Sequence, residues 1–202
     1  VEGAGLSLRG YLPALGLAVA AALLLRGVIV TGVKVPSGSM LPTLQVGDYL
    51  LVTPLRYGLR LPGIGWVTRW AEPQAGDVVI FAGPRDDNQD YVKRVAAVGG
   101  ELVEVRDGQL IVDGAPRMFP GTTTAHPAPG SQLPVRPDNF GPVPVPVGKL
   151  FMLGDSRDRS IDSRVWGFVD VNDVRGKAGA IYWSMDGDDG WVRWERLGSE
   201  VR

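Results

Sequence analysis

The 202-residue sequence has no cysteine and a single histidine, His126. The lack of cysteine excludes a thiol nucleophile, a disulfide framework and a thiolate metal site, and one histidine excludes a multi-histidine zinc site. An excess of positive charge is also missing, since 21 basic and 22 acidic side chains give a formal net charge of −1. A nucleic-acid partner is therefore not expected, because no global basic field would attract phosphates.

A long apolar run occurs only near the amino terminus. Residues 11–25 carry no charge, and apolar residues resume after Arg26. Fifteen helical residues span about 22 Å, less than a hydrocarbon core of about 30 Å, so a crossing helix needs Arg26 to snorkel. A removable secretory signal is the alternative. We predict a short amino terminus at 1–11, a transmembrane helix and interfacial segment at 12–33, and a domain at 34–202.

The 28 glycines and 16 prolines follow no repeat and predict a mainly β fold with many turns. Apolar alternation between turn signals predicts strands at 48–52, 77–81, 91–95, 149–154 and 178–185, and a hairpin with arms 101–105 and 109–112. Residues 116–146 hold nine prolines and are expected to form a long extended excursion. We expect a loop at 155–167 and a solvated turn at 186–190.

A candidate nucleophile follows the apolar run. Residues 36–44, PSGSMLPTL, place Ser37 and Ser39 around a glycine between two prolines. A serine held in so stiff a turn could be a nucleophile, although serines next to glycine and proline usually satisfy turn backbone. A nucleophilic serine also needs a base, here His126 or a lysine. His126 lies in an irregular proline-rich stretch without a nearby acidic residue, and we expect it to be incidental.

Lys93 is the other candidate base. In a strand at 91–95 its side chain shares a face with Tyr91 and Val95, whereas Arg94 points to the opposite face. One of these adjacent cations therefore faces an apolar surface. A lysine becomes a base near neutral pH only if burial lowers its pKa from about 10.4. An exposed Lys-Arg pair on a strand edge is the alternative.

Several segments together resemble one family. Residues 36–44 resemble the serine box of bacterial type I signal peptidases, membrane-bound Ser/Lys enzymes that cut signal peptides from exported proteins. Residues 91–95, YVKRV, resemble their lysine box, and residues 154–167, GDSRDRSIDSRVWG, their third hallmark. The strand GDVVIF at 76–81 and YGLRLP at 57–62 extend the resemblance, which runs in order from about residue 12 to about residue 185. Ordered motifs at compatible spacing are more specific than any one of them.

The resemblance implies a β-rich signal-peptidase-like catalytic domain behind one transmembrane helix. It makes Ser39 the nucleophile and Lys93 the general base. Ser37 and the Ser39 amide would form the oxyanion hole, and Ser160 would hydrogen-bond the lysine ammonium. With one span before the serine, the amino terminus would start in the cytoplasm, which places the enzyme in the plasma membrane with its catalytic domain on the extracytoplasmic side.

The third motif holds a candidate ion pair and two departures from the family. Asp162 and Arg164 are two residues apart, so in an extended segment they project to one side and can pair, which would fix the loop carrying Ser160. A surface ion pair of little energetic value is the alternative. Many family members have asparagine where Ser156 and Arg159 stand, and Leu-Pro-Gly-Asp where residues 98–101 read VGGE.

The family's mechanism implies how a substrate would bind. An exported preprotein would lie as an extended strand between residues 33–35 and 90–92. Shallow apolar pockets would accept only small side chains, as the family's Ala-x-Ala preference implies. Their expected walls are Val33, Val35, Met40, Leu44 and Val92. No metal or cofactor is needed, because Lys93 takes the Ser39 proton and water hydrolyses the acyl-enzyme.

The other expected partners are the lipid bilayer and, as a candidate, the export machinery. Trp66 and Trp70, in a loop-like stretch, are expected to contribute to an interfacial belt. Two other classes of function stay open. One is a related Ser/Lys protease, of the pilin-maturation or self-cleaving repressor type. The other is a membrane-tethered β-rich binding module without catalysis.

Overall fold

The computed structural model describes residues 11–18, 30–61, 63–83, 89–123, 139–186 and 189–202. Residues 11–18 are helical, and no helix among the described residues is long and apolar enough to cross a membrane. Half of the predicted span at 12–33, residues 19–29, lies outside the described part. Its last residues are not helical, because Thr31–Lys34 forms strand β1 and pairs with β2.

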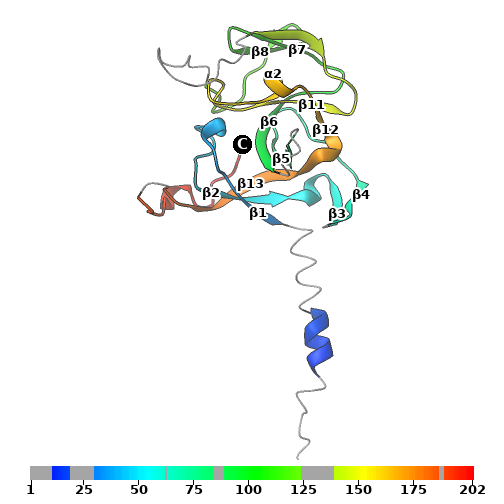
Figure 1. Cartoon of the computed structure of the whole chain (residues 1–202), viewed down its shortest axis with the longest axis vertical. Coiled ribbons are helices and arrows are strands. Elements are labelled where there is room, and N and C mark those ends of the chain that lie inside the picture. The colour runs from blue at the N-terminus through cyan, green and yellow to red at the C-terminus, as the bar shows by residue number, and fades with distance from the viewer. Residues whose placement is uncertain (1–10, 19–29, 62, 84–88, 124–138, 187–188) are drawn as a thin grey trace, which may run out of the picture.

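A seven-stranded sheet forms the larger part of the fold (Figure 1). In spatial order its strands are β1 (Thr31–Lys34), β2 (Asp48–Thr53), β13 (Val174–Ser184), β5 (Val78–Ala82), β6 (Asp90–Val98), β11 (Lys149–Leu153) and β12 (Val169–Asp170). Every neighbouring pair is antiparallel. Since four antiparallel steps separate β1 from β6, these two strands run in the same direction along the sheet.

Two smaller sheets complete the fold, and Figure 1 shows them at opposite ends of the strand-built region. One has the order β10 (Phe140–Pro144), β7 (Leu102–Arg106), β8 (Gln109–Val112) and β9 (Ala115–Pro116). The other pairs β3 (Gly58–Leu61) with β4 (Gly65–Arg69). Four short helices lie between strands: the 3₁₀ helices Gly38–Met40, Pro54–Arg56 and Val171–Asp173, and α2 (Ser163–Trp166); a further 3₁₀ helix, Trp194–Arg196, follows the last strand.

An apolar cluster joins the segment of the candidate nucleophile to the large sheet. Met40 and Leu44 follow Ser39 and are buried against Leu50 of β2 and Ile80 of β5. Burying one such side chain contributes about 1.5–3 kcal/mol to folding. Val35, which precedes Ser39, belongs to the same cluster, so the proline-bracketed turn is held on both sides of Ser39 by core packing.

The predicted strands and the hairpin are confirmed to within a few residues, except that β13 begins four residues earlier than predicted. The hairpin turn has Asp107 at φ 50° and Gly108 at φ 75°, the left-handed conformation that Asp-Gly tolerates. At its carboxyl end the expected extended excursion forms strand β10, which pairs with β7. β10 is the edge strand of its sheet, where prolines are tolerated. Residues 124–138 of the excursion, including His126, lie outside the described residues.

Two further expectations need correction. Residues 155–167 are not only loop, because Asp162 accepts a hydrogen bond from the Arg164 N–H and caps α2. Trp66 lies in β4 rather than in a loop, and its indole donates to the Val174 carbonyl at 3.1 Å. Trp70, just beyond β4, is 59% exposed.

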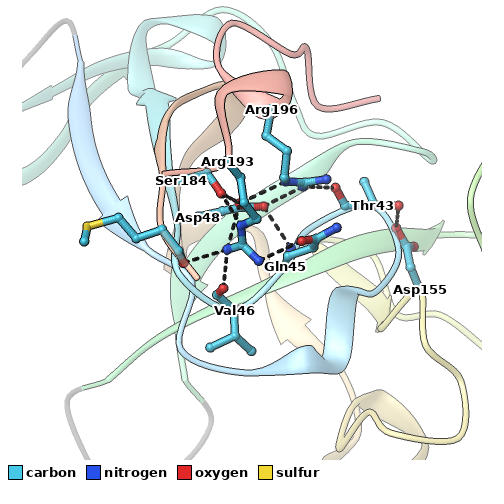
Figure 2. A network of polar contacts seen from close by, with 9 residues as sticks. Thr43, Gln45, Val46, Asp48, Asp155, Ser184, Arg193 and Arg196 are labelled. Atoms are coloured by element: carbon cyan, nitrogen blue, oxygen red, sulfur yellow. Dashed lines mark hydrogen bonds and ion pairs between the residues drawn. The ribbon is translucent and has the colours of Figure 1, made fainter. Parts of the chain in front are cut away.

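A buried carboxylate, Asp48 of β2, fastens the carboxyl-terminal segment to the sheet (Figure 2). It accepts hydrogen bonds from the Ser184 hydroxyl at 2.6 Å and from Arg196 Nη2 at 2.6 Å. Arg193 donates to Gln45 Oε1 at 2.7 Å, beside the same carboxylate. These contacts join the last strand and the carboxyl terminus to the chain that follows Ser39.

Asp48 predicts an acid-dependent loss of stability. Burial raises the pKa of the Asp48 carboxyl, but hydrogen bonds from Arg196, Ser184 and a backbone N–H outweigh it and hold the pKa below its ordinary value. The stabilisation is then complete above the unfolded pKa of about 3.9 and is lost as the pH falls through the folded value. Asp48→Asn is expected to lower the free energy of unfolding by about 2 kcal/mol at pH 7 and by less at pH 3.

Urea denaturation at the two pH values measures this difference. The exposed Asp173→Asn serves as the control and should change stability little at either pH. If Asp48→Asn lowers the free energy of unfolding by the same amount at pH 7 and at pH 3, the ionisation of Asp48 does not stabilise the fold as predicted.

Candidate active site

The structure brings Ser39 and Lys93 into direct contact, although 54 residues separate them. Ser39 lies in the 3₁₀ helix Gly38–Met40 and Lys93 in β6. Lys93 Nζ donates to Ser39 Oγ at 2.6 Å. Both residues are buried, with exposed fractions of 8% for Ser39 and 4% for Lys93. An unprotonated amine at this distance from a hydroxyl can take its proton, which is the first requirement of a nucleophilic serine.

The sequence predicted that one of the adjacent cations faces an apolar surface, and the structure buries both of them. Arg94 is 2% exposed and lies on the other face of β6 from Lys93, where a carboxylate neutralises it. Its Nε and Nη2 both donate to Asp155, each at 2.7 Å. Asp155 also accepts from the Thr43 hydroxyl at 2.6 Å, a contact visible in Figure 2. This network ties the lysine strand, the serine segment and the loop after β11 together.

Ser37 lies beside the nucleophile, at the amino end of the 3₁₀ helix. Its Oγ is 3.4 Å from Ser39 Oγ, and its side chain is exposed. A hydroxyl in this position can reach an oxygen of a substrate bound at Ser39.

Ser160 does not make the predicted hydrogen bond to Lys93. Its side chain is fully buried, and its Oγ has no hydrogen-bond partner within the described residues. It packs against Gly154, where an added Cβ would lie 2.2 Å from Ser160 Oγ and 2.5 Å from the Ser39 carbonyl oxygen. Glycine at 154 thus lets the end of β11, Ser160 and the Ser39 backbone approach one another closely.

The pairing of Asp162 with Arg164 is confirmed, but its expected extended geometry is wrong because α2 begins at Ser163. Arg164 Nε and Nη2 donate to the two Asp162 oxygens at 2.8 and 2.9 Å. Neither side chain is more than 1% exposed, so this is not a surface pair. Asp162 also accepts from the Gly154 N–H, and Arg164 donates to the Arg157 carbonyl at 2.7 Å. The pair therefore fixes both ends of the loop that carries Ser160.

A cavity of about 290 Å³ opens over the Ser39 and Lys93 side chains. Val35, Met40 and Val92, three of the five predicted wall residues, line it. Val33 lines a neighbouring cavity instead. Leu44 is fully buried in the core cluster and lies behind the site, because the chain turns inward after Pro42.

The sequence profile of one family, described as signal peptidase, peptidase S26, matches residues 8–183. The chain belongs to this family. Signal peptidase I of Pseudomonas fluorescens is 36% identical over 192 residues, covering 80% of this chain and 68% of that one. Probable signal peptidase I-1 of Synechocystis sp. is 34% identical over 197 residues, covering 93% and 86%. A crystal structure of signal peptidase I from Enterococcus faecalis has 31% identity and a TM-score of 0.43, covering 53% of this chain and 97% of that one.

As a member of the signal peptidase family, the protein is a serine endopeptidase that cleaves signal peptides. The residues that depart from the family's usual pattern lie around the site without entering the Ser39 to Lys93 contact. The Ser156 N–H donates to the Ser39 carbonyl at 3.2 Å, and its hydroxyl donates to Asp158 at 2.8 Å. Arg159 lines the rim of the cavity with a side chain that is 60% exposed.

The third departure, at residues 98–101, closes a turn. Glu101 accepts a hydrogen bond from the Val98 N–H at 2.8 Å and pairs with Arg117 at 2.7 Å. Gly100 has φ 95°, which glycine adopts without strain. The hydrogen bonds of this turn are thus satisfied by local partners at the end of the lysine strand.

Proposed function

We propose that this signal peptidase works through a Ser/Lys dyad, with Ser39 as nucleophile and Lys93 as general base. The observation that carries the proposal is the 2.6 Å contact between the two buried side chains. A non-catalytic binding module gives no reason to bury an amine against a hydroxyl, since burial of a cation is costly. No described feature favours a pilin-maturation or repressor-type protease over cleavage of signal peptides.

The reaction is a two-step acyl transfer. Unprotonated Lys93 takes the Ser39 proton, and Ser39 Oγ attacks the scissile carbonyl carbon. The Ser37 hydroxyl and the Ser39 N–H donate to the oxyanion of the tetrahedral intermediate. Lys93 then gives its proton to the leaving amine of the mature protein, and a water molecule, deprotonated by Lys93, hydrolyses the ester on Ser39. Asp162 and Arg164 hold the loop of Ser160 against this site.

The preprotein is proposed to bind as an extended strand between the end of β1 and residues 90–92 of β6. Because β1 and β6 run in the same direction and both lead toward the dyad, one substrate strand can lie parallel to both. Substrate residues before the cleaved bond then extend back along β1, away from Ser39. Val35, Met40 and Val92 bound the cavity next to the dyad, which favours a small side chain before the cleaved bond.

The protein is proposed to be anchored in the plasma membrane by the apolar segment that begins at residue 12 and ends before β1, with the strand-built domain on the extracytoplasmic side. The charge-free run at 11–25 supports the anchor. Ile64, Val67 and Trp70 of the β3–β4 region are each more than half exposed, which suits contact with a bilayer interface. Exported preproteins and the lipid bilayer are therefore the proposed partners, with the export machinery as a candidate.

Cleavage of a preprotein by the detergent-solubilised protein tests the proposal. Replacing alanine by leucine immediately before the cleaved bond is expected to lower kcat/KM about 100-fold, because overpacking a fitted apolar pocket costs about 1–3 kcal/mol. The same replacement one residue earlier is the matched control, since that side chain points away from the cavity in a strand.

The fragments are identified by mass spectrometry. Cleavage at a site without a small residue, or equal tolerance of leucine at both positions, would overturn the proposed binding mode. If the wild-type protein cleaves no preprotein, the proposed reaction itself is refuted.

A further inference from the structure

A second cavity, of about 300 Å³, continues the proposed substrate groove away from the dyad. Asp90 lines both cavities, and Val33, one alternation before Val35 on β1, lines the second. Unlike the first cavity, the second also has two arginines in its wall, Arg60 of β3 and Arg175 of β13. The sequence motifs gave neither arginine a role.

Strand geometry sets which substrate residue reaches this cavity, given the proposed binding mode, on which this inference rests. Side chains two apart in a strand point to one face and lie about 6.6–6.8 Å apart. Val35 lines the first cavity, and Val33 and Thr31 line the second. In a parallel substrate strand, the residue immediately before the cleaved bond lies next to Val35. Counting back from that bond, the third residue then lies next to Val33 and the fifth next to Thr31.

The charges around the second cavity are not balanced. Arg175 Nε lies 2.8 Å from Asp90 Oδ1, as an ion contact without the alignment of a hydrogen bond. Arg60 Nε is buried and has no hydrogen-bond partner in the described part of the chain. Among the described residues that line this cavity, two guanidinium groups thus share one carboxylate, and a buried donor without an acceptor is unfavourable.

The pKa of Arg60 is consistent with this excess of positive charge. Burial lowers the pKa of Arg60, and the positive charge of Arg175 lowers it further, while Asp90 opposes both. An additional acceptor or negative charge in this cavity would therefore be stabilised by Arg60.

We propose that the part of the second cavity next to Thr31 is a specificity subsite for the fifth residue before the cleaved bond, and that Arg60 and Arg175 make it prefer an acidic or amide side chain to a basic one. The anion is assigned to the substrate rather than to a lipid phosphate because Asp90 lines both cavities and so joins this one to the groove proposed to bind the peptide.

The test compares three substrates that differ only at the fifth residue, with glutamate, glutamine or lysine, and that keep alanine at the first and third. The wild-type enzyme is expected to cleave the glutamate substrate with a kcat/KM about fivefold above that of the lysine substrate, the size of a modest ion pair, with glutamine between them. Arg60→Gln and Arg175→Gln are expected to bring this ratio close to one, and Arg60→Glu to reverse it.

Each ratio is measured within one enzyme preparation, so a variant that folds less well still reports its preference. Arg106→Gln is the matched control, because Arg106 is an exposed arginine of β7 in a different sheet and does not line the cavity. It should keep the wild-type ratio. Equal cleavage of the glutamate and lysine substrates by the wild type, or an unchanged ratio in Arg60→Gln, overturns the subsite while leaving the dyad intact. Loss of all cleavage in the wild type would instead refute the proposed function.

A lipid phosphate gives a different outcome. The same enzymes are assayed with vesicles of phosphatidylcholine alone or mixed with phosphatidylglycerol. If Arg60→Gln removes a stimulation by the anionic vesicles and leaves the substrate ratio unchanged, the cavity binds a headgroup and the proposal is wrong.

Discussion

Ser39→Ala is expected to lower kcat/KM on a preprotein by about 10⁴-fold or more, the scale seen when a protease loses its nucleophile. Without Oγ no acyl-enzyme can form, and only binding and oxyanion stabilisation remain. Lys93→Met is expected to cause a loss of similar size, because methionine occupies comparable volume but cannot take the Ser39 proton. The double variant should be no worse than either single one, since the two groups act as a unit.

The measurement is initial-rate cleavage of one preprotein, with thermal unfolding of each variant as a check of the fold. Ser199→Ala and Lys149→Met are matched controls at an exposed serine and at a surface lysine paired with Asp170, and both should retain activity. A Lys93→Met enzyme with more than a few per cent of wild-type activity would remove Lys93 from the role of base. A fully active Ser39→Ala enzyme would refute the serine mechanism altogether.

The dyad could be predicted from the sequence because it depends on short motifs in a fixed order. Residues 36–44 and 91–95 each carry their own local signal, and alternation in β6 correctly placed Lys93 and Arg94 on opposite faces. What alternation could not show is that both faces of β6 are buried. That follows from packing on both faces of β6, since Val92 belongs to one buried apolar cluster and Val95, on the other face, to a second.

The supporting contacts could not be predicted because they join distant parts of the chain. Arg94 and Asp155 are 61 residues apart, and Thr43 and Asp155 are 112 apart, so no local periodicity links them. All three residues lie inside the motifs that resemble the family, and this position was the one sign in the sequence that they could belong to the site. By contrast, Asp162 and Arg164 are close enough in sequence for their pairing to be foreseen, and only the helical start at Ser163 was missed.

Asp155→Ala is expected to destabilise the fold by about 3–5 kcal/mol, since it leaves the Arg94 guanidinium buried without its carboxylate. Arg94 and Asp155 are 2% and 1% exposed, so water cannot replace the lost partner. Arg94 would keep only carbonyl acceptors, those of Gly76 and Arg202. Urea denaturation measures the loss, and Glu104→Ala, which removes the partner of the exposed Arg106, is the control, with an expected change of about 0–1 kcal/mol.

Asp155→Ala also tests whether the Arg94 to Asp155 pair positions the dyad or only stabilises the fold. Asp155 holds Thr43 in the serine segment and Arg94 beside Lys93, so its removal is expected to loosen the Ser39 to Lys93 contact before the domain unfolds. Activity of Asp155→Ala should therefore fall at a temperature at which the protein is still folded by circular dichroism, whereas Asp48→Asn should lose activity and structure together. Coincident losses in both variants would show that the Arg94 to Asp155 pair stabilises the fold without positioning the dyad.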